Sequence, residues 1–440
     1  MEVTARHCVV FIILDAFRWD YLNTEDAPLL AEMAEGGIHC RKVVTSPGFA
    51  QRSSIFCGAY PDATGNYAMY AFDPKGSPFR GILSFPSLVT LDEEPWINHL
   101  PRIKGIRYLQ RRAQYRRGVK RQEARKRIER DARKYAVHAP ASHIPFGVLP
   151  FLNVSEDQKE INSTNALGTE SIFDLCAESG VRIEYLMFPV VNCEDDLVLT
   201  KAIERVESGA RFFLLQFSDS DLKMHLAGTS TLERRKVVGE LDRKIRALKK
   251  VFDADFPSTT WVIIGDHGMM DVEKEVNVAD IVHGEARRRG LKHIMDYLLF
   301  LDSTVARIWS LSNKAEALVP SVFVEQKSLR ESGRLLTPET ARQYRMPFGD
   351  RRYGDCIWLA NPGTLIFPDY FHDATNHNKA MHGYDRFHDD MKGMAIVYGK
   401  DIPPRMIEEV QLVDICPTLC DLLRVRYPQK CEGKSIFAVG

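Results

Sequence analysis

The 440-residue chain has no long apolar segment. Its N-terminal apolar run, Cys8 to Leu14, has 7 residues and ends at Asp15, whereas a membrane-spanning helix needs about 20. No basic leader or cleavage motif accompanies this run, so a secretory signal is not indicated. We therefore expect no transmembrane segment and predict a cytoplasmic location.

Cysteine pairs with the spacing of metal ligands are also missing. The 9 cysteines are scattered without C-x-x-C spacing, and Cys8 and Cys57 lie inside apolar segments. A zinc–cysteine cluster is therefore not indicated. Reduced, buried thiols in a cytoplasmic protein are the simplest interpretation.

The chain has no net charge, because 59 Lys and Arg balance 59 Asp and Glu. Net charge thus indicates no class of partner. The charged residues, however, are unevenly distributed along the chain. Residues 101–134 hold 15 Lys or Arg and 3 acidic residues. A solvated helical face is the ordinary interpretation of such a run. With Tyr108 and Tyr115 interleaved, contact with an anionic lipid surface, nucleic acid or a polyphosphate substrate is the alternative.

Short apolar runs rich in Val, Ile and Phe predict four buried strands, because they are too short for core helices. They lie at residues 8–14, 212–217, 261–264 and 394–398. Helical patterns lie around and between them, at 27–35, 48–59, 170–179, 231–252 and 407–424. This alternation predicts the α/β class, with a doubly wound, mostly parallel sheet covered by helices on both faces.

The length allows one large domain with insertions or two domains. We predict a single α/β domain over residues 1–440 that carries two capping insertions. The first is a basic, helical insertion at 92–165, and the second is a mixed α/β segment at 275–380.

Three aspartates and three histidines lie close to the ends of the predicted strands. They follow the first, second and third strands or shortly precede the fourth: Asp15; Asp221 and His225; Asp266 and His267; His382. Ligands of open parallel sheets bind beyond the carboxyl ends of the strands. Each residue alone is more often a cap or turn residue. Together, carboxylate and imidazole groups suit zinc or a similar divalent metal, and two such ions can clamp a phosphoryl group.

The same segments resemble a known family, in family order. The segments are FIILDAFRWDYL, CGAYPDATGNYAMYAFDP, DSDLKMHLAG, IIGDHGM, MHGYDRFHDDMKGMAIVYG and VDICPTLCDLL. They resemble the type I phosphodiesterase / nucleotide pyrophosphatase branch of the alkaline phosphatase superfamily. The resemblance runs from residue 8 to about 425, and it implies an alkaline-phosphatase-like fold.

The resemblance also implies two metal ions, both zinc, and a division of the ligands between them. It assigns Asp15, Asp266 and His267 to one ion, and Asp221, His225 and His382 to the other. Spacing alone only groups the six residues, and carboxylate–imidazole sites also accept Mn or Fe. The implied mechanism is attack of a hydroxyl on phosphorus, followed by hydrolysis of a covalent phospho-enzyme.

The attacking residue departs from the family pattern. The family's Thr nucleophile stands ten residues before a Gly that corresponds to Gly58, and this position is Gly48. We favour Ser46, as the N-cap of a helix whose first residue is Pro47, because the helix dipole would stabilise a developing alkoxide there. Thr45 is the second candidate. Direct attack by metal-bound hydroxide, without a protein nucleophile, is a third alternative.

Two residues are predicted to bind substrate. Arg52 falls where the related sulfatases carry an arginine. Asn66 lies near an Asn that binds phosphoryl oxygens in the family, although the equivalent position by spacing is Met69. If Asn66 has no such role, it is a turn residue after Gly65.

The predicted function is metal-dependent hydrolysis of phosphodiester or phosphoanhydride bonds in a phosphorylated substrate, such as a nucleotide or a lipid-linked phosphate. A phosphomonoesterase, sulfatase or phosphomutase of the same superfamily is the alternative among enzymes, although no Cys-x-Pro-Ser-Arg motif of sulfatases is present. From a different class, the alternative is a pseudoenzyme that binds anionic partners through residues 101–134.

Overall fold

The computed structural model describes residues 7–84, 104–132, 143–156, 160–191, 194–229, 231–316, 318–372 and 377–439. Within these ranges, no helix combines the length and the apolar composition needed to cross a membrane.

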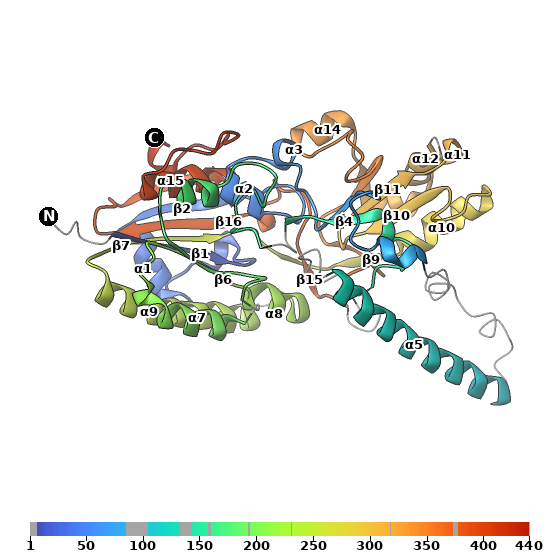
Figure 1. The fold of residues 1–440 in the computed structure, drawn as a ribbon, viewed down its shortest axis with the longest axis horizontal. Helices are drawn as coiled ribbons and strands as arrows, with labels where there is room; N and C mark the ends of the chain where they lie inside the picture. Colours follow the sequence, from blue (N-terminus) through green and yellow to red (C-terminus); the bar gives the residue numbers. More distant parts are fainter. Residues whose placement is uncertain are drawn as a thin grey trace.

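A seven-stranded sheet in the order β17-β2-β16-β7-β1-β6-β5 forms one half of the molecule, on the left in Figure 1. Its strands are β1 (His7–Leu14), β2 (Ile38–Val44), β5 (Ile183–Leu186), β6 (Phe212–Phe217), β7 (Ser258–Gly265), β16 (Gly393–Gly399) and β17 (Arg405–Gln411). Neighbouring strands are parallel except where β16 pairs with β7 and β2. The predicted mostly parallel sheet is confirmed, and β16 is its antiparallel member.

Both faces of this sheet are buried, as strand β1 shows. Val10 and Ile12 pack into the core on one face, and Phe11 and Ile13 into the core on the other, because successive side chains of a strand point to opposite faces. The first face is covered by α1 (Pro28–Gly36), α7 (Asp195–Glu204) and α9 (Thr231–Asp255), and the second by α2 (Arg52–Cys57), α6 (Ile172–Glu178) and α15 (Ile415–Leu423). Figure 1 shows the two helical layers, which confirm the doubly wound arrangement.

Several boundaries differ from the sequence prediction. The predicted helix at 407–424 is strand β17 followed by α15, and the predicted helix at 48–59 begins only at Arg52. Strand β17 is an edge strand whose Glu408 and Glu409 are exposed, as is common for charged residues of edge strands. Its apolar residues Met406, Ile407 and Val410 have the spacing of an amphipathic helix, so the sequence pattern did not distinguish this strand from a helix.

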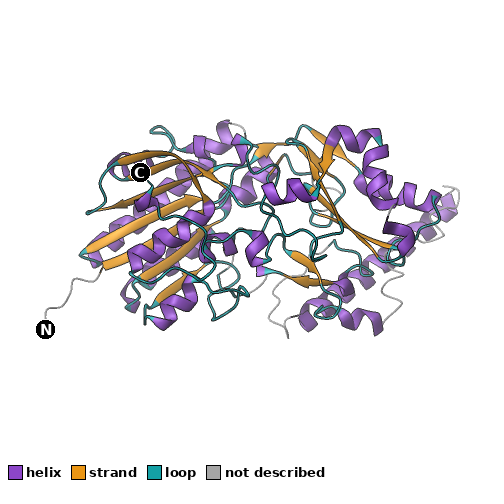
Figure 2. Ribbon diagram, turned by 90° about the horizontal axis from the view of Figure 1, so that it is seen from above, coloured by secondary structure: helices purple, strands orange, loops and turns teal. Residues whose placement is uncertain are grey.

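A second, antiparallel sheet in the order β10-β11-β13-β12 lies beyond the main sheet (Figure 2). Its strands are β10 (Tyr297–Leu301), β11 (Val305–Ser310), β12 (Gly333–Leu335) and β13 (Cys356–Ala360), with α10 (Val278–Arg288), α11 (Asn313–Glu316), α12 (Leu318–Glu325), α13 (Lys327–Ser332) and α14 (Pro338–Gln343) around them. We call residues 275–380 the cap. The mixture of helices and strands agrees with the predicted composition of this segment, while its domain boundaries stay a prediction.

Short elements connect the two sheets. Three two-stranded pairs are β3 (Tyr70–Phe72) with β4 (Leu152–Val154), β8 (Met270–Asp271) with β15 (Ala380–Met381), and β9 (Lys274–Val276) with β14 (Thr364–Ile366). The short helices are α3 (Pro61–Thr64) and α8 (Asp219–Ala227).

The basic segment forms α5 (Lys104–Ala132), a helix of 29 residues that extends away from the rest of the molecule in Figure 1. A helix was predicted in this region. Of the predicted insertion at 92–165, residues 92–103, 133–142 and 157–159 lie outside the described residues.

Candidate active site

The three predicted aspartates meet at the carboxyl edge of the main sheet. Strands β6 and β7 flank β1 in parallel, so that Leu14 pairs with Phe217 on one side and Gly265 on the other. Asp15 and Asp266 directly follow β1 and β7, and Asp221 lies in the first turn of α8 after β6. All three line one cavity of about 350 Å³.

His382 reaches the same cavity because β16 is antiparallel. A residue that precedes an antiparallel strand lies beside residues that follow its parallel neighbours. His225 and His267 also line the cavity. The structure therefore brings all six predicted ligands together.

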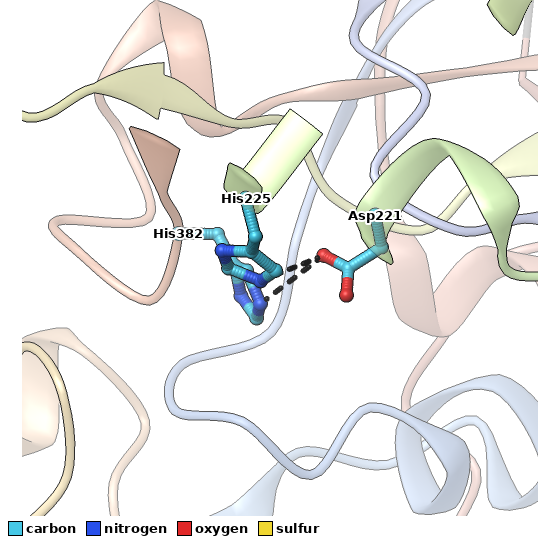
Figure 3. A group of neighbouring side chains, drawn as sticks. All are labelled: Asp221, His225 and His382. Carbon is cyan, nitrogen blue, oxygen red and sulfur yellow. Dashed lines mark ion pairs between the residues drawn. The ribbon is translucent and has the colours of Figure 1, made fainter. Parts of the chain in front are cut away.

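Asp221, His225 and His382 face one another (Figure 3). The Asp221 Oδ1 atom lies 3.2 Å from His225 Nε2 and 3.5 Å from His382 Nε2. Asp221 and His225 are four residues apart on α8 and so share one face of the helix. The Asp221 Oδ1 atom is buried and has no hydrogen-bond partner among the described residues. A buried carboxylate oxygen without a partner, facing two imidazole nitrogens, fits a divalent cation.

A second group of possible ligands consists of Asp15, Asp221 and His267. His267 Nε2 lies 3.3 Å from Asp15 Oδ1. Asp266 is farther away, with its Oδ2 atom 3.9 Å from His267 Nε2, and its Oδ1 atom accepts hydrogen bonds from the backbone N–H groups of Ala16 and His267. Asp221 thus belongs to both groups, and Asp266 lies beside the second.

Backbone carbonyls orient two of the imidazoles. The Nδ1 atom of His225 lies 2.8 Å from the carbonyl oxygen of Ala380, and that of His267 lies 3.1 Å from the carbonyl oxygen of Gly268. When Nδ1 donates to a carbonyl, Nε2 carries the lone pair that binds a metal. Both Nε2 atoms point toward carboxylates of the cavity.

Burial makes the charges of this cavity strongly interdependent. Burial, opposed by His267 and reinforced by Asp15, raises the pKa of Asp266 to about 7. For His267, burial favours the neutral ring, but Asp266 and Asp15 outweigh it and raise the pKa to about 10. Burial and the nearby His267 hold the pKa of His382 well below its usual value. Three carboxylates in a buried site are thus compensated only in part by the imidazoles, which again fits a cation.

The predicted nucleophiles, Thr45 and Ser46, are buried but do not line the cavity. Thr45 Oγ1 donates to Gln51 Oε1 (3.0 Å), and Ser46 Oγ donates to Ser54 Oγ (2.5 Å). The prediction that Ser46 caps the helix is wrong, because α2 begins at Arg52 and Gln51 occupies the N-cap position.

The loop before α2 is held by the Gln51 side chain. Its Nε2 atom donates to the carbonyl oxygens of Ser46 and Gly48, at 3.1 and 2.9 Å. Gly48 has a φ of +82°, and a Cβ atom there would lie 2.1 Å from the carbonyl oxygen of Tyr67. The family-spaced position is therefore closed to any side chain in this loop conformation.

Of the two predicted substrate-binding residues, Arg52 lines the cavity and Asn66 does not. Arg52 donates to the carbonyl oxygen of Phe188 and to Gln216 Oε1, at 2.8 and 3.2 Å. Asn66 Nδ2 instead donates to Ser53 Oγ at 2.7 Å. Met69, the position equivalent by spacing, does line the cavity.

The cap supplies a wall of the cavity that the sequence analysis missed. Its lining residues are Asp302, Ser303, Phe371 and His372. Buried Asp369 binds two of them, since its Oδ2 atom lies 2.8 Å from both Ser303 Oγ and His372 Nδ1. Beyond His372, the Asn378 amide lies 2.8 Å from His372 Nε2 and 3.2 Å from His225 Nδ1. A signal for Asp302 was present, because it directly follows the apolar run of β10 as Asp15 follows that of β1.

The carboxylate of Asp302 forms an ion pair with an arginine of the cap. The Nε atom of the fully buried Arg307 donates to Asp302 Oδ2 at 2.9 Å, and its Nη1 atom donates to the carbonyl oxygen of Tyr70 at 2.6 Å. The guanidinium carbon lies 4.6 Å from the centre of the Phe300 ring. Burial, opposed by Arg307, raises the pKa of Asp302 to about 6.

A doubly wound sheet with aspartates and histidines gathered at its carboxyl edge is the arrangement expected of a metal-dependent hydrolase. The model of the type I phosphodiesterase / nucleotide pyrophosphatase family matches residues 9–385. The chain belongs to this family, whose members are metal-dependent hydrolases of phosphoric ester or anhydride bonds.

Solved structures show the same fold at low sequence identity. Human ectonucleotide pyrophosphatase / phosphodiesterase 5 is 17% identical, with a TM-score of 0.67 over 98% of this chain and 97% of that chain. The murine protein is 16% identical, with a TM-score of 0.66 over 98% of each chain. An inactive variant of the murine protein in complex with AMP is 15% identical, with a TM-score of 0.61 over 96% of each chain. No curated protein sequence matches the chain.

Proposed function

We propose that the chain hydrolyses phosphodiester or phosphoanhydride bonds with two divalent cations, zinc before manganese or iron. The observation that carries the proposal is the buried Asp221 Oδ1 atom, which faces His225 and His382 and has no hydrogen-bond partner among the described residues. Oxygen and nitrogen donors of this kind favour zinc, and they also accept manganese or iron.

In this proposal the ligands divide as the family resemblance implies. Asp221, His225 and His382 hold one cation, and Asp15, Asp266 and His267 hold the other. When bound, the cations supply positive charge to the reacting phosphoryl group. The carbonyls of Ala380 and Gly268 keep His225 and His267 turned toward the cations. The Arg52 guanidinium at the cavity wall binds phosphoryl oxygens.

For the substrate we propose a nucleotide, with a lipid-linked phosphate as the second candidate. Three aromatic side chains, Phe49, Phe188 and Phe371, line the cavity beside the candidate ligands. Aromatic faces stack on nucleobases, and the name of the family and the AMP complex of a structural relative agree with this choice. The cytoplasmic location stays a prediction.

Ser46 and Thr45 stay the predicted nucleophiles. To reach phosphorus, the Ser46 hydroxyl would have to leave Ser54, or the Thr45 hydroxyl would have to leave Gln51. If neither hydroxyl attacks, water attacks phosphorus directly, as in the third alternative above. Its oxygen then forms the new P–O bond while the bond to the leaving oxygen breaks, and the proton of the water is released to solvent.

The function is tested with protein purified with zinc or manganese. We expect hydrolysis of bis-p-nitrophenyl phosphate and of dinucleotide pyrophosphates to exceed that of p-nitrophenyl phosphate, with no hydrolysis of p-nitrophenyl sulfate. A chelator should abolish turnover and added metal should restore it. Equal turnover with and without metal would refute the proposal, and faster monoester cleavage would move the assignment to a phosphomonoesterase.

The nucleophile is tested separately with Ser46→Ala and Thr45→Ala, using Ser163→Ala, at an exposed position, as the control. A nucleophile variant should lose turnover and fail to form a phospho-enzyme in a rapid acid quench. Full activity of both variants would eliminate both residues and leave direct attack by water.

A further inference from the structure

Helix α5 carries a positive surface that the hydrolytic site does not use. From Lys104 to Gln122 its sequence holds 8 Lys or Arg and no acidic residue. At 1.5 Å per residue, the whole helix is about 43 Å long. None of the residues that line the cavity comes from α5.

The C-terminal turns of α5 are anchored to the cap side of the molecule. Ala124 and Ile128 are buried in a core that also contains Ile144 and Phe146. Arg125 lies over the Phe146 ring, 4.4 Å from its centre, and donates a hydrogen bond to the carbonyl oxygen of Ile144. The helix is therefore fixed at one end, and the turns before Ala124 extend outward (Figure 1).

The face opposite the anchor exposes apolar side chains. Tyr108, Tyr115 and Val119 are 63%, 74% and 38% exposed. At 100° per residue they fall within about 40° of one another, and Tyr115 points about 180° away from buried Ala124. These residues thus form a stripe along the outer face of the helix.

Arginines flank this stripe on both sides. Arg111 and Arg112 fall on opposite sides of it on the helical wheel, and Arg116 lies one turn farther on. All three are exposed, and none forms an ion pair or hydrogen bond with any part of the chain that the structure describes. Their charges are therefore available to a partner.

We propose that this outer face of α5, defined by Tyr108, Tyr115, Val119, Arg111, Arg112 and Arg116, docks the protein on an anionic lipid surface. Helices that lie in a membrane interface combine aromatic and aliphatic side chains with flanking Lys and Arg. Each basic residue near the surface is attracted to anionic headgroups. Proteins bind nucleic acid mainly through contacts with its phosphates. Such contacts would leave the exposed apolar side chains of Val119 and Leu109 without a binding partner.

The test uses the full-length protein and vesicles of phosphatidylcholine with or without about 30% phosphatidylserine. We expect cosedimentation with the anionic vesicles only, weakened as the NaCl concentration rises. The variant Arg111→Glu/Arg112→Glu/Arg116→Glu should bind roughly 100-fold more weakly, since each of the three basic residues contributes about fivefold. The variant Tyr108→Ser/Tyr115→Ser should lose binding at both low and moderate salt concentration.

A matched control reverses three charges on the cap instead. Arg288, Lys327 and Arg342 have side chains that are 76%, 78% and 77% exposed, so Arg288→Glu/Lys327→Glu/Arg342→Glu changes the net charge equally. It should bind anionic vesicles like the wild type. Thermal melting and turnover of bis-p-nitrophenyl phosphate should be unchanged in the α5 variants, which shows that they fold.

Three results would overturn the proposal. One is no binding to anionic vesicles by the folded wild type. Another is equal loss of binding in the control variant, which would indicate a general charge effect. The third is tighter binding of a 20-nucleotide RNA or DNA than of vesicles, with the loss confined to the arginine variant, which would assign the face to nucleic acid.

Discussion

Two aspartates, the buried Asp302 and the partly buried Asp221, face the same cavity from opposite sides and have different partners. Asp302, on the cap, is paired with Arg307 at 2.9 Å. Asp221, at the edge of the main sheet, has a buried Oδ1 atom without a hydrogen-bond partner among the described residues and faces two histidines instead. A buried carboxylate requires a compensating charge. The cap obtains that charge from its own arginine, whereas at the sheet edge it comes from histidines or, as we propose, from a bound cation.

The two sides of the cavity therefore compensate the charge of a carboxylate in different ways. On the cap side, stability should depend on the chain alone. On the sheet side, activity should depend on metal. Substitutions on the two sides should therefore have distinct effects on activity, metal content and folding.

The largest effect is expected for Asp221→Asn. Metal ions stabilise transition-state charge by several kcal/mol, and each 1.36 kcal/mol is tenfold in rate. We therefore expect kcat/KM for bis-p-nitrophenyl phosphate to fall roughly 1000-fold. Metal content after dialysis should also fall, and the rise in melting temperature that zinc gives the wild type should disappear.

The control for this variant is Asp219→Asn on the same helix, because the Asp219 carboxylate pairs with Lys223 at 2.9 Å. It should keep its metal and its activity. If Asp221→Asn also kept both, the contrast between the two aspartates would have no functional meaning.

The next largest effect is expected on the other side, for Arg307→Met. Removing one partner of a buried ion pair costs about 3–5 kcal/mol, because the other charge stays buried without compensation. We expect this loss in the free energy of unfolding by urea, with and without metal. The double variant Asp302→Asn/Arg307→Met should recover most of it. A double variant as unstable as the single one would show that Arg307 acts through Tyr70 and the aromatic rings rather than through Asp302.

The sheet side was largely predictable from the sequence, and the reason lies in its strands. Short apolar runs identified β1, β6, β7 and β16, and the carboxyl-edge rule then grouped the six residues that follow or flank them. His382 was grouped correctly although it precedes its strand. Only the antiparallel direction of β16, which the run of residues does not reveal, explains its position.

The loop before α2 and the cap wall were not predictable in the same way. Gly48 is constrained by the carbonyl of Tyr67, and Arg307 bonds the carbonyl of Tyr70, 237 residues away along the chain. Gln51 occupies the cap position instead of Ser46, and its amide binds four groups of the loop. These contacts depend on tertiary packing, and no local pattern encodes them.

A smaller effect is expected for Asn378→Ala, which connects the two sides. The buried Asn378 amide lies between His372 on the cap and His225 at the sheet edge. Loss of a group that orients a metal ligand typically lowers metal affinity about 10–100-fold. We expect this decrease in a competition with a chelating dye, with little change in the urea midpoint. Asn361→Ala, at a cap position whose amide bonds the carbonyl of Glu331, should leave the affinity unchanged, and equal losses in both variants would mean that Asn378 has no specific role.

The smallest effect is expected for Ser303→Ala, because the carboxylate that it serves has other partners. Asp369 Oδ2 accepts from Ser303 Oγ and lies equally close to His372 Nδ1, while its Oδ1 atom accepts from the backbone N–H groups of Phe371 and His372 at 3.0 and 2.9 Å. Removing one of four partners should cost about 1 kcal/mol in the free energy of unfolding and should leave metal affinity unchanged. In the proposed mechanism, Asp221 acts through a bound cation. Loss of that cation alone should therefore abolish function. A tenfold fall in the metal affinity of Ser303→Ala would show that the cap carboxylates also help to hold the cation, and the two sides of the cavity would then form one electrostatic unit.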